Sequence, residues 1–187
     1  MLKNKWSLYT GFLPHIFLDQ LNIKYDFVFI DSAHVAPGEI LNLIEVLPFL
    51  NDNAVIAVHD IFWHFTRKET PPPIEVKFTP SNIYLISALY GEKVIFKNEI
   101  ENIGAVFLYN DQKQHYLDYF LLLNSFWEYM PSDTQIKELR VFIKKYYNNN
   151  FYLKLFDHSV QNNKIHINKF KNFVNKCVQN STRNNIF

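Results

Sequence analysis

Two short apolar runs, each followed by acidic or histidine residues, constrain the fold of this chain more than any other feature. Residues 25–30 (YDFVFI) and 54–58 (AVIAV) are rich in β-branched and aromatic residues, which is typical of strands buried on both faces of a parallel sheet. Between them, residues 38–50 place apolar side chains at the spacing of a helix. Residues 51–53 (NDN) are expected to form the following turn. This order predicts a right-handed βαβ unit and an α/β fold.

Weaker patterns predict further elements on both sides of this unit. Upstream, we expect a strand at 6–10 and a helix at 13–21. Downstream, we expect a loop at 66–73, a helix from Thr79-Pro80 to Tyr90 that Gly91 stops, and strands at 93–96 and 105–109 joined by a turn at 97–102.

The character of the sequence changes near residue 111, where polar and aromatic helical patterns replace the strand patterns. We expect helices at 116–130, at 132–145 behind the capping box of Ser132 and Gln135, and at 166–178, with a break at 148–150. The predicted organisation is a partial α/β domain at 1–110 and a helical extension at 111–187.

Composition excludes several function classes. The 187 residues are 48% hydrophobic and carry a net charge of +1, so charge favours neither a nucleic-acid nor a membrane partner. The single cysteine, Cys177, can form no internal disulfide. No apolar run approaches the roughly 18 residues that span a bilayer, and the N-terminal pattern is unlike a secretory signal. A cytoplasmic location is therefore expected.

Five side chains that can carry chemistry follow the two main strands. They are Asp31, His34, His59, Asp60 and His64. Ligands of open parallel sheets bind beyond the carboxyl ends of the strands, so these groups are expected to converge there, to hold a divalent cation or to exchange protons. An alternative is that the acids only cap the next helix and that the histidines lie at the surface.

Glycine usage excludes the common phosphate-binding loops. The four glycines, Gly11, Gly38, Gly91 and Gly104, form neither a G-x-G nor a P-loop pattern. The aromatic residues after 115 are expected to pack on the sheet, because no basic groove accompanies them to make a base-stacking platform.

Residues 25–34 (YDFVFIDSAH), 47–50 (LPFL) and 54–61 (AVIAVHDI) together resemble class I S-adenosylmethionine-dependent methyltransferases. The resemblance is to the small-molecule and sugar O-methyltransferase branch, where one strand ends in Asp followed by His and a later strand ends in His-Asp or two acids. It covers residues 6–109 and implies a Rossmann-like sheet with an antiparallel final hairpin. The implied activity is O-methylation of a sugar or small hydroxylated metabolite, with S-adenosylmethionine as cofactor.

By position, the resemblance implies that Asp31, His59 and Asp60 bind a divalent cation such as Mg²⁺. The cation would hold neighbouring hydroxyl groups of the acceptor and lower the pKa of the one that attacks. The resemblance further suggests His34 or His64 as the catalytic base.

The family's first two strands and its glycine-rich turn have no counterpart in the sequence. We therefore expect the chain alone to bind S-adenosylmethionine weakly or not at all, with the missing half lost or supplied by another chain. Two alternatives stay open: a non-catalytic relative that binds a partner, and a metal-dependent hydrolase using Asp31, His59 and Asp60.

The strand neighbours are also predicted. Residues 6–10 are expected beside 25–30 in parallel, and 54–58 beside 105–109 in antiparallel orientation. If 6–10 does not pair, either a second copy or a complementing chain pairs with the exposed edge of 25–30, or the edge stays open.

Overall fold

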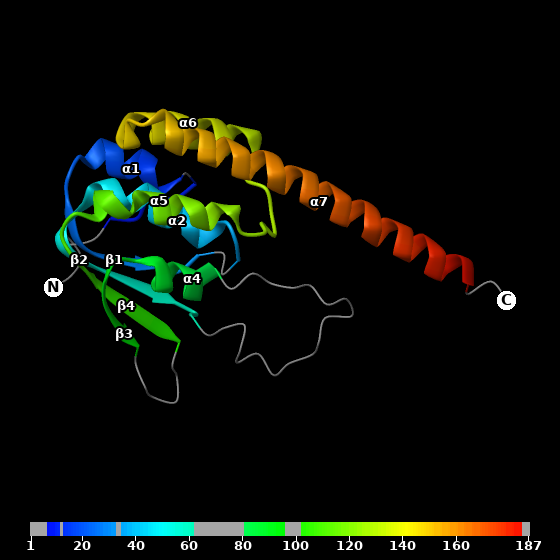
Figure 1. Ribbon diagram of the computed structural model, residues 1–187, viewed down its shortest axis with the longest axis horizontal. Coiled ribbons are helices and arrows are strands. Elements are labelled where there is room, and N and C mark those ends of the chain that lie inside the picture. Colours follow the sequence, from blue (N-terminus) through cyan, green and yellow to red (C-terminus); the bar gives the residue numbers. More distant parts are fainter. Residues whose placement is uncertain (1–6, 12, 33–34, 62–80, 96–101, 185–187) are drawn as a thin grey trace.

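The computed structural model describes residues 7–11, 13–32, 35–61, 81–95 and 102–184, and these form an α/β structure of three layers. The sheet has four strands. In Figure 1 it is followed by a layer with α1 (Pro14–Leu21), α2 (Gly38–Val46) and α5 (Tyr116–Leu121), and then by α6 (Asp133–Tyr147) and α7 (Asn150–Asn184). The short helix α4 (Ser81–Ala88) lies against the sheet. No described helix combines the length and the apolar character needed to cross a membrane.

The predicted βαβ unit is present. Strand β1 (Tyr25–Ile30) runs parallel to β2 (Leu50–His59), with Phe27 opposite Val55 and Ile30 opposite Val58, and α2 connects them. The prediction of a turn at 51–53 is wrong. Pro48, which lacks an amide hydrogen, lies in a short 3-10 segment, η1 (Leu47–Phe49). The strand begins directly afterwards.

The sheet order is β1-β2-β4-β3. Strand β4 (Ile103–Leu108) lies antiparallel to β2, and β3 (Gly91–Ile95) lies antiparallel to β4. The neighbours predicted for 54–58 and the final hairpin are therefore confirmed. Gly91 opens β3 instead of only stopping a helix, and a Cβ atom there would collide with the carbonyl oxygen of Phe107.

The strand predicted at 6–10 is absent from its described part, residues 7–10, which pair with no strand. The ring of Tyr9 instead packs on Phe17 of α1, 4.7 Å between centroids. Within the described residues, β1 consequently has β2 as its single neighbour and is an edge strand.

The prediction that both main strands are buried on both faces is wrong for β1. Val28 and Ile30 pack on the core, but Phe27 and Phe29 are 59% and 48% exposed. Figure 1 shows why: the helices lie on one side of the sheet, and no described element covers the other.

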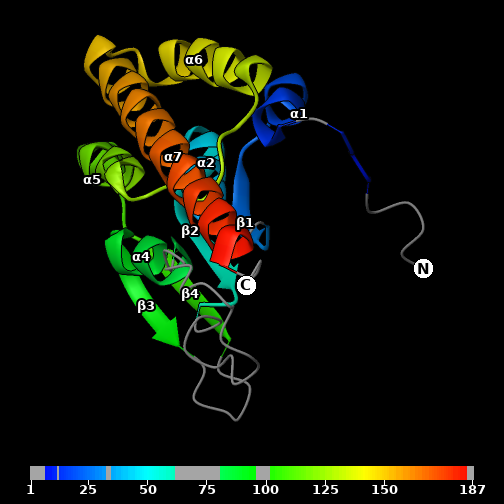
Figure 2. The ribbon, with the colours of Figure 1, turned by 90° about the vertical axis from the view of Figure 1, so that its right-hand side faces the viewer.

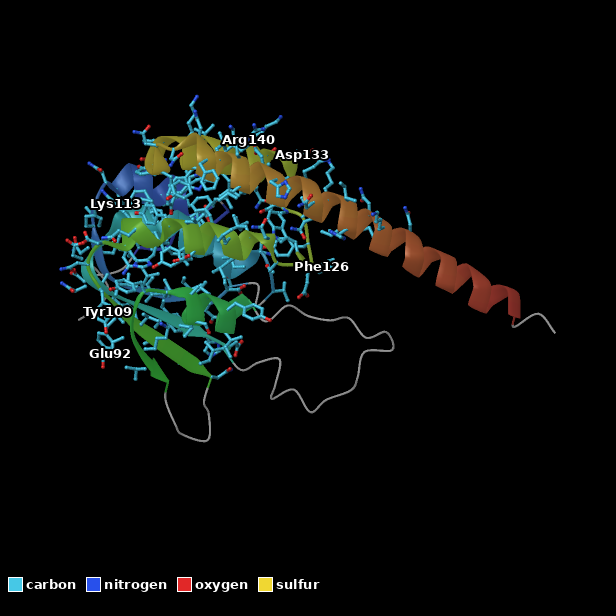
Figure 3. The ribbon with its side chains drawn as sticks, in the orientation of Figure 1. Glu92, Tyr109, Lys113, Phe126, Asp133 and Arg140 are labelled. Carbon is cyan, nitrogen blue, oxygen red and sulfur yellow. The ribbon has the colours of Figure 1, made fainter. Side chains whose placement is uncertain are left out.

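The core has two parts. One lies between the sheet and helices α2 and α4, and includes Ile56, Val58 and Leu85. The other lies among the helices and includes Ile40, Ile44, Trp127, Phe142 and Phe156, so it unites residues from before and after position 111. Side chains fill the space between the layers, whereas Asp133 and Arg140 are exposed on α6 (Figure 3).

Two helix predictions after residue 111 need correction. The helix expected at 116–130 ends with α5 and the 3-10 segment η3 (Leu122–Asn124), because the chain then turns and buries Trp127. The helix expected at 166–178 is part of α7, which already begins at Asn150. The predictions for 66–73, Thr79-Pro80 and 97–101 lie outside the described residues.

Candidate metal centre

Asp31, His59 and Asp60 meet at the carboxyl edge of the sheet. Strands β1 and β2 run in parallel, so the residues that follow them lie side by side. One ligand atom from each of the three side chains lies within 4.8 Å of the other two. The predicted convergence is confirmed for these three residues, while metal binding itself stays a prediction.

His59 lies between the two carboxylates. Its Nδ1 atom is 3.5 Å from Asp31 Oδ1 and 3.3 Å from Asp60 Oδ2. The side-chain amide of Asn82 in α4 donates a hydrogen bond of 2.7 Å to the His59 carbonyl oxygen. Helix α4 thereby fixes the end of β2.

Asp60 is the most buried of the three, with 7% of its side chain exposed. Its backbone has a left-handed φ of 54°, which ends the extended strand. Asn102 donates a side-chain hydrogen bond to Asp60 Oδ1, and its carbonyl oxygen accepts one of 3.2 Å from the amide of Ile61. Sequence reasoning missed Asn102, because 42 residues separate it from Asp60.

Asp31 is the open member of the group, with 44% of its side chain exposed. The alternative role as a helix cap does not apply to it, since Pro37 is the N-cap of α2. His34 and His64, the predicted bases, lie outside the described residues.

The donor set fits a divalent cation. One imidazole nitrogen and two carboxylate oxygens are ligands that Mg²⁺, Mn²⁺ and Zn²⁺ accept. Metal–ligand bonds of ~2.1 Å place neighbouring ligand atoms ~3.0–3.4 Å apart in octahedral or tetrahedral geometry. The two distances at His59 Nδ1 are close to this range. Without a cation, the same geometry allows a protonated His59 to form ion pairs with both acids.

The glycine residues do not provide a comparable binding site for the methyl donor, S-adenosylmethionine. Gly11 lies in the segment before α1, Gly38 is the first residue of α2, and Gly91 and Gly104 lie in β3 and β4. None of the four belongs to a glycine-rich turn that would bring backbone amides to the cofactor.

The chain was compared with models of known protein families, with curated protein sequences and with solved structures, and none of the three comparisons found a match.

Proposed function

We propose that this chain is a methyltransferase-like protein that binds a divalent cation through Asp31, His59 and Asp60. The observation that supports it best is the convergence of the three ligand atoms at the carboxyl edge of β1 and β2. The proposed substrate class is a sugar or another small hydroxylated metabolite, and the proposed reaction is O-methylation.

Each residue of the site has a distinct role in this proposal. Asp60, held by Asn102, and His59, whose backbone is held by Asn82, supply preorganised ligands. Asp31, the exposed member, closes the coordination on the solvent side. A bound cation would orient two neighbouring hydroxyl groups and lower the pKa of one of them. Since the sequence has no glycine-rich turn, the proposed roles of these residues concern the cation and the acceptor hydroxyl groups only.

Calorimetric titration of the chain with Mg²⁺, Mn²⁺ and Zn²⁺ tests the cation site. We expect Asp31→Asn to weaken binding about tenfold or more, because it removes an anionic ligand. Asp52→Asn, at an exposed position in β2, is the matched control and should leave binding unchanged. Failure of all three cations to bind would refute the site.

A second titration, with S-adenosylmethionine, tests the relation to methyltransferases. We expect weak or no binding by the chain alone. A micromolar dissociation constant would show that this chain binds the cofactor without the glycine-rich turn. It would then support the proposal that the chain by itself is a methyltransferase.

The second candidate function is a non-catalytic binding module. The observation in its favour is the uncovered face of the sheet, where Phe27, Phe29 and Phe107 are about half exposed. Loss of cation binding would remove both the methyltransferase and the metal-dependent hydrolase proposals, and would leave this one.

A further inference from the structure

Among the described residues, strand β1 has a neighbour on one edge only. It pairs with β2 on one side, and no described strand lies on its other side (Figure 2). In such a strand, the backbone N–H and C=O groups of every second residue point away from the sheet. Natural edge strands usually carry charges or proline as protection against pairing. Residues 27–30 (FVFI) carry neither, and the single charged residue of β1 is Asp26 near its start, which accepts a hydrogen bond from the Asn51 side chain.

The side chains of this edge extend an apolar surface. Phe27 and Phe29 lie opposite Val55 and Ala57 of β2, so they share the uncovered face of the sheet. Val55 in turn lies opposite Phe107 of β4. As far as the structure describes the chain, no strand occupies the outer hydrogen-bonding groups of β1, and its two phenylalanine rings are about half exposed.

We propose that two copies of this chain associate through β1, antiparallel, around a twofold axis at Val28. A twofold axis that relates neighbouring antiparallel strands must be perpendicular to the sheet. The same face of both sheets then points in the same direction, and Val28 lies opposite Val28 of the second copy. The two four-stranded sheets become one continuous sheet.

This register pairs aromatic side chains on the uncovered face. Phe27 of each copy lies opposite Phe29 of the other, which gives two aromatic cross-strand pairs. The axis at Val28 also centres the contact on residues 27–29, on the regular side of the irregularity that lies between Tyr25 and Phe27.

The charges next to β1 favour the antiparallel orientation. Lys24 precedes the strand and Asp31 follows it. With the axis at Val28, Lys24 of one copy lies opposite Ser32 of the other, one residue from Asp31, at both ends of the contact, whereas parallel pairing would place like charges together. In the single copy the Lys24 side chain is exposed, and its Nζ atom donates a hydrogen bond to the carbonyl oxygen of Pro48, just before β2.

Sedimentation velocity over a concentration series tests the association. We expect a reversible monomer–dimer equilibrium of the intact chain and its loss in Phe27→Lys, which places like charges on both copies. Phe107→Lys is the matched control, because Phe107 is as exposed on the same face but lies in β4. A monomeric wild type at all concentrations, or equal loss in both variants, would overturn the proposal.

A cysteine crosslink tests the register, in a background where Cys177→Ser removes the native thiol. Val28→Cys should form an intermolecular disulfide, because the two Cα atoms would be ~4.5–5.5 Å apart. Asp26→Cys should not, since the two positions would be four residues, or ~13 Å, apart along the strands. Efficient crosslinking at 26 and none at 28 would refute this register even if the chain dimerises.

Discussion

Glu45 is a carboxyl group buried in the helical layer. Its Oε1 atom lies 2.5 Å from His15 Nδ1, and the imidazole packs on the ring of Phe142 with 4.6 Å between centroids. Burial raises the pKa of Glu45, and the hydrogen bond from His15 opposes this only in part. Because the folded state takes up a proton on Glu45 more readily than the unfolded chain, this group favours folding most at low pH.

We predict that Glu45→Gln changes the pH dependence of stability. The contribution of Glu45 is fully present below its unfolded pKa near 4.5 and is lost as pH rises through the higher folded pKa. Glutamine does not titrate, so the Tm of the variant relative to wild type should rise from about pH 4 to about pH 8. Thermal unfolding followed by circular dichroism measures this. Glu92→Gln, at an exposed position, is the control, and an unchanged Tm difference across the range would contradict the prediction.

Tyr147 contributes a second buried polar contact in the same region. Its hydroxyl donates a hydrogen bond of 2.6 Å to the carbonyl oxygen of Ile44, and burial raises its pKa well above the usual value. We predict that Tyr147→Phe lowers the free energy of unfolding by about 1 kcal/mol, because the Ile44 carbonyl loses its donor. Urea unfolding measures the change. Tyr84→Phe, in which the ring is half exposed, should have almost no effect.

At the scale of residues, the sequence predicted Asp31, His59 and Asp60 because each directly follows a recognisable strand, so its position is a local property. Asn82 and Asn102 could not be predicted in the same way. They reach the site only when α4 and β4 pack against the end of β2. His15 likewise has no local signal for Glu45, which lies thirty residues away.

Among the elements, α6 has the best-defined start. The Ser132 hydroxyl accepts a hydrogen bond from the amide of Gln135, whose side chain accepts one from the amide of Ser132. We predict that Ser132→Ala lowers the free energy of unfolding by about 1 kcal/mol. Thr134→Ala, at an exposed position one residue away from Gln135, is the control in chemical denaturation. Equal effects of the two substitutions would show that the cap does not stabilise the helix.

The helices differ in how far their sequences predict them. The cap of α6 was visible because a capping box is a pattern of four consecutive residues. The first half of α7 was missed because its buried stripe contains Ser159 and Asn163, which interrupt the apolar periodicity. Asn163 is buried because it accepts a hydrogen bond from the amide of Trp127 and donates to the carbonyl oxygens of Ser125 and Ser159. That network depends on the tertiary structure.

In the molecule as a whole, the core cluster among the helices contains residues from before and after position 111. Trp127 is fully buried in it together with Ile40 and Ile44 of α2. We predict that Trp127→Ala lowers the free energy of unfolding by roughly 3–5 kcal/mol and leaves one cooperative transition. Urea unfolding followed by far-ultraviolet circular dichroism measures both quantities. Two separated transitions, of which only one shifts, would indicate that residues 1–110 and 111–187 unfold independently.

The edge position of β1 could be predicted only as one of several outcomes. Apolar strands with similar local composition occur in the middle and at the border of a sheet, so residues 25–30 do not reveal their number of neighbours. The neighbour on the other side depended on residues 7–10, whose Tyr9 contacts α1 instead. The position of the helices on one side of the sheet likewise depends on contacts between residues that are far apart in the sequence.

The edge also determines how the amide protons of the sheet exchange with solvent. Strand β2 has a partner on both sides at Val55, Ile56, Ala57 and Val58, so consecutive amides there should all exchange slowly. In a single copy, β1 should instead show alternating slow and fast exchange with a period of two residues. Association through the edge would slow the exchange of the fast-exchanging amides of β1. The exchange pattern of β1 would therefore show whether a partner strand is bound at its free edge.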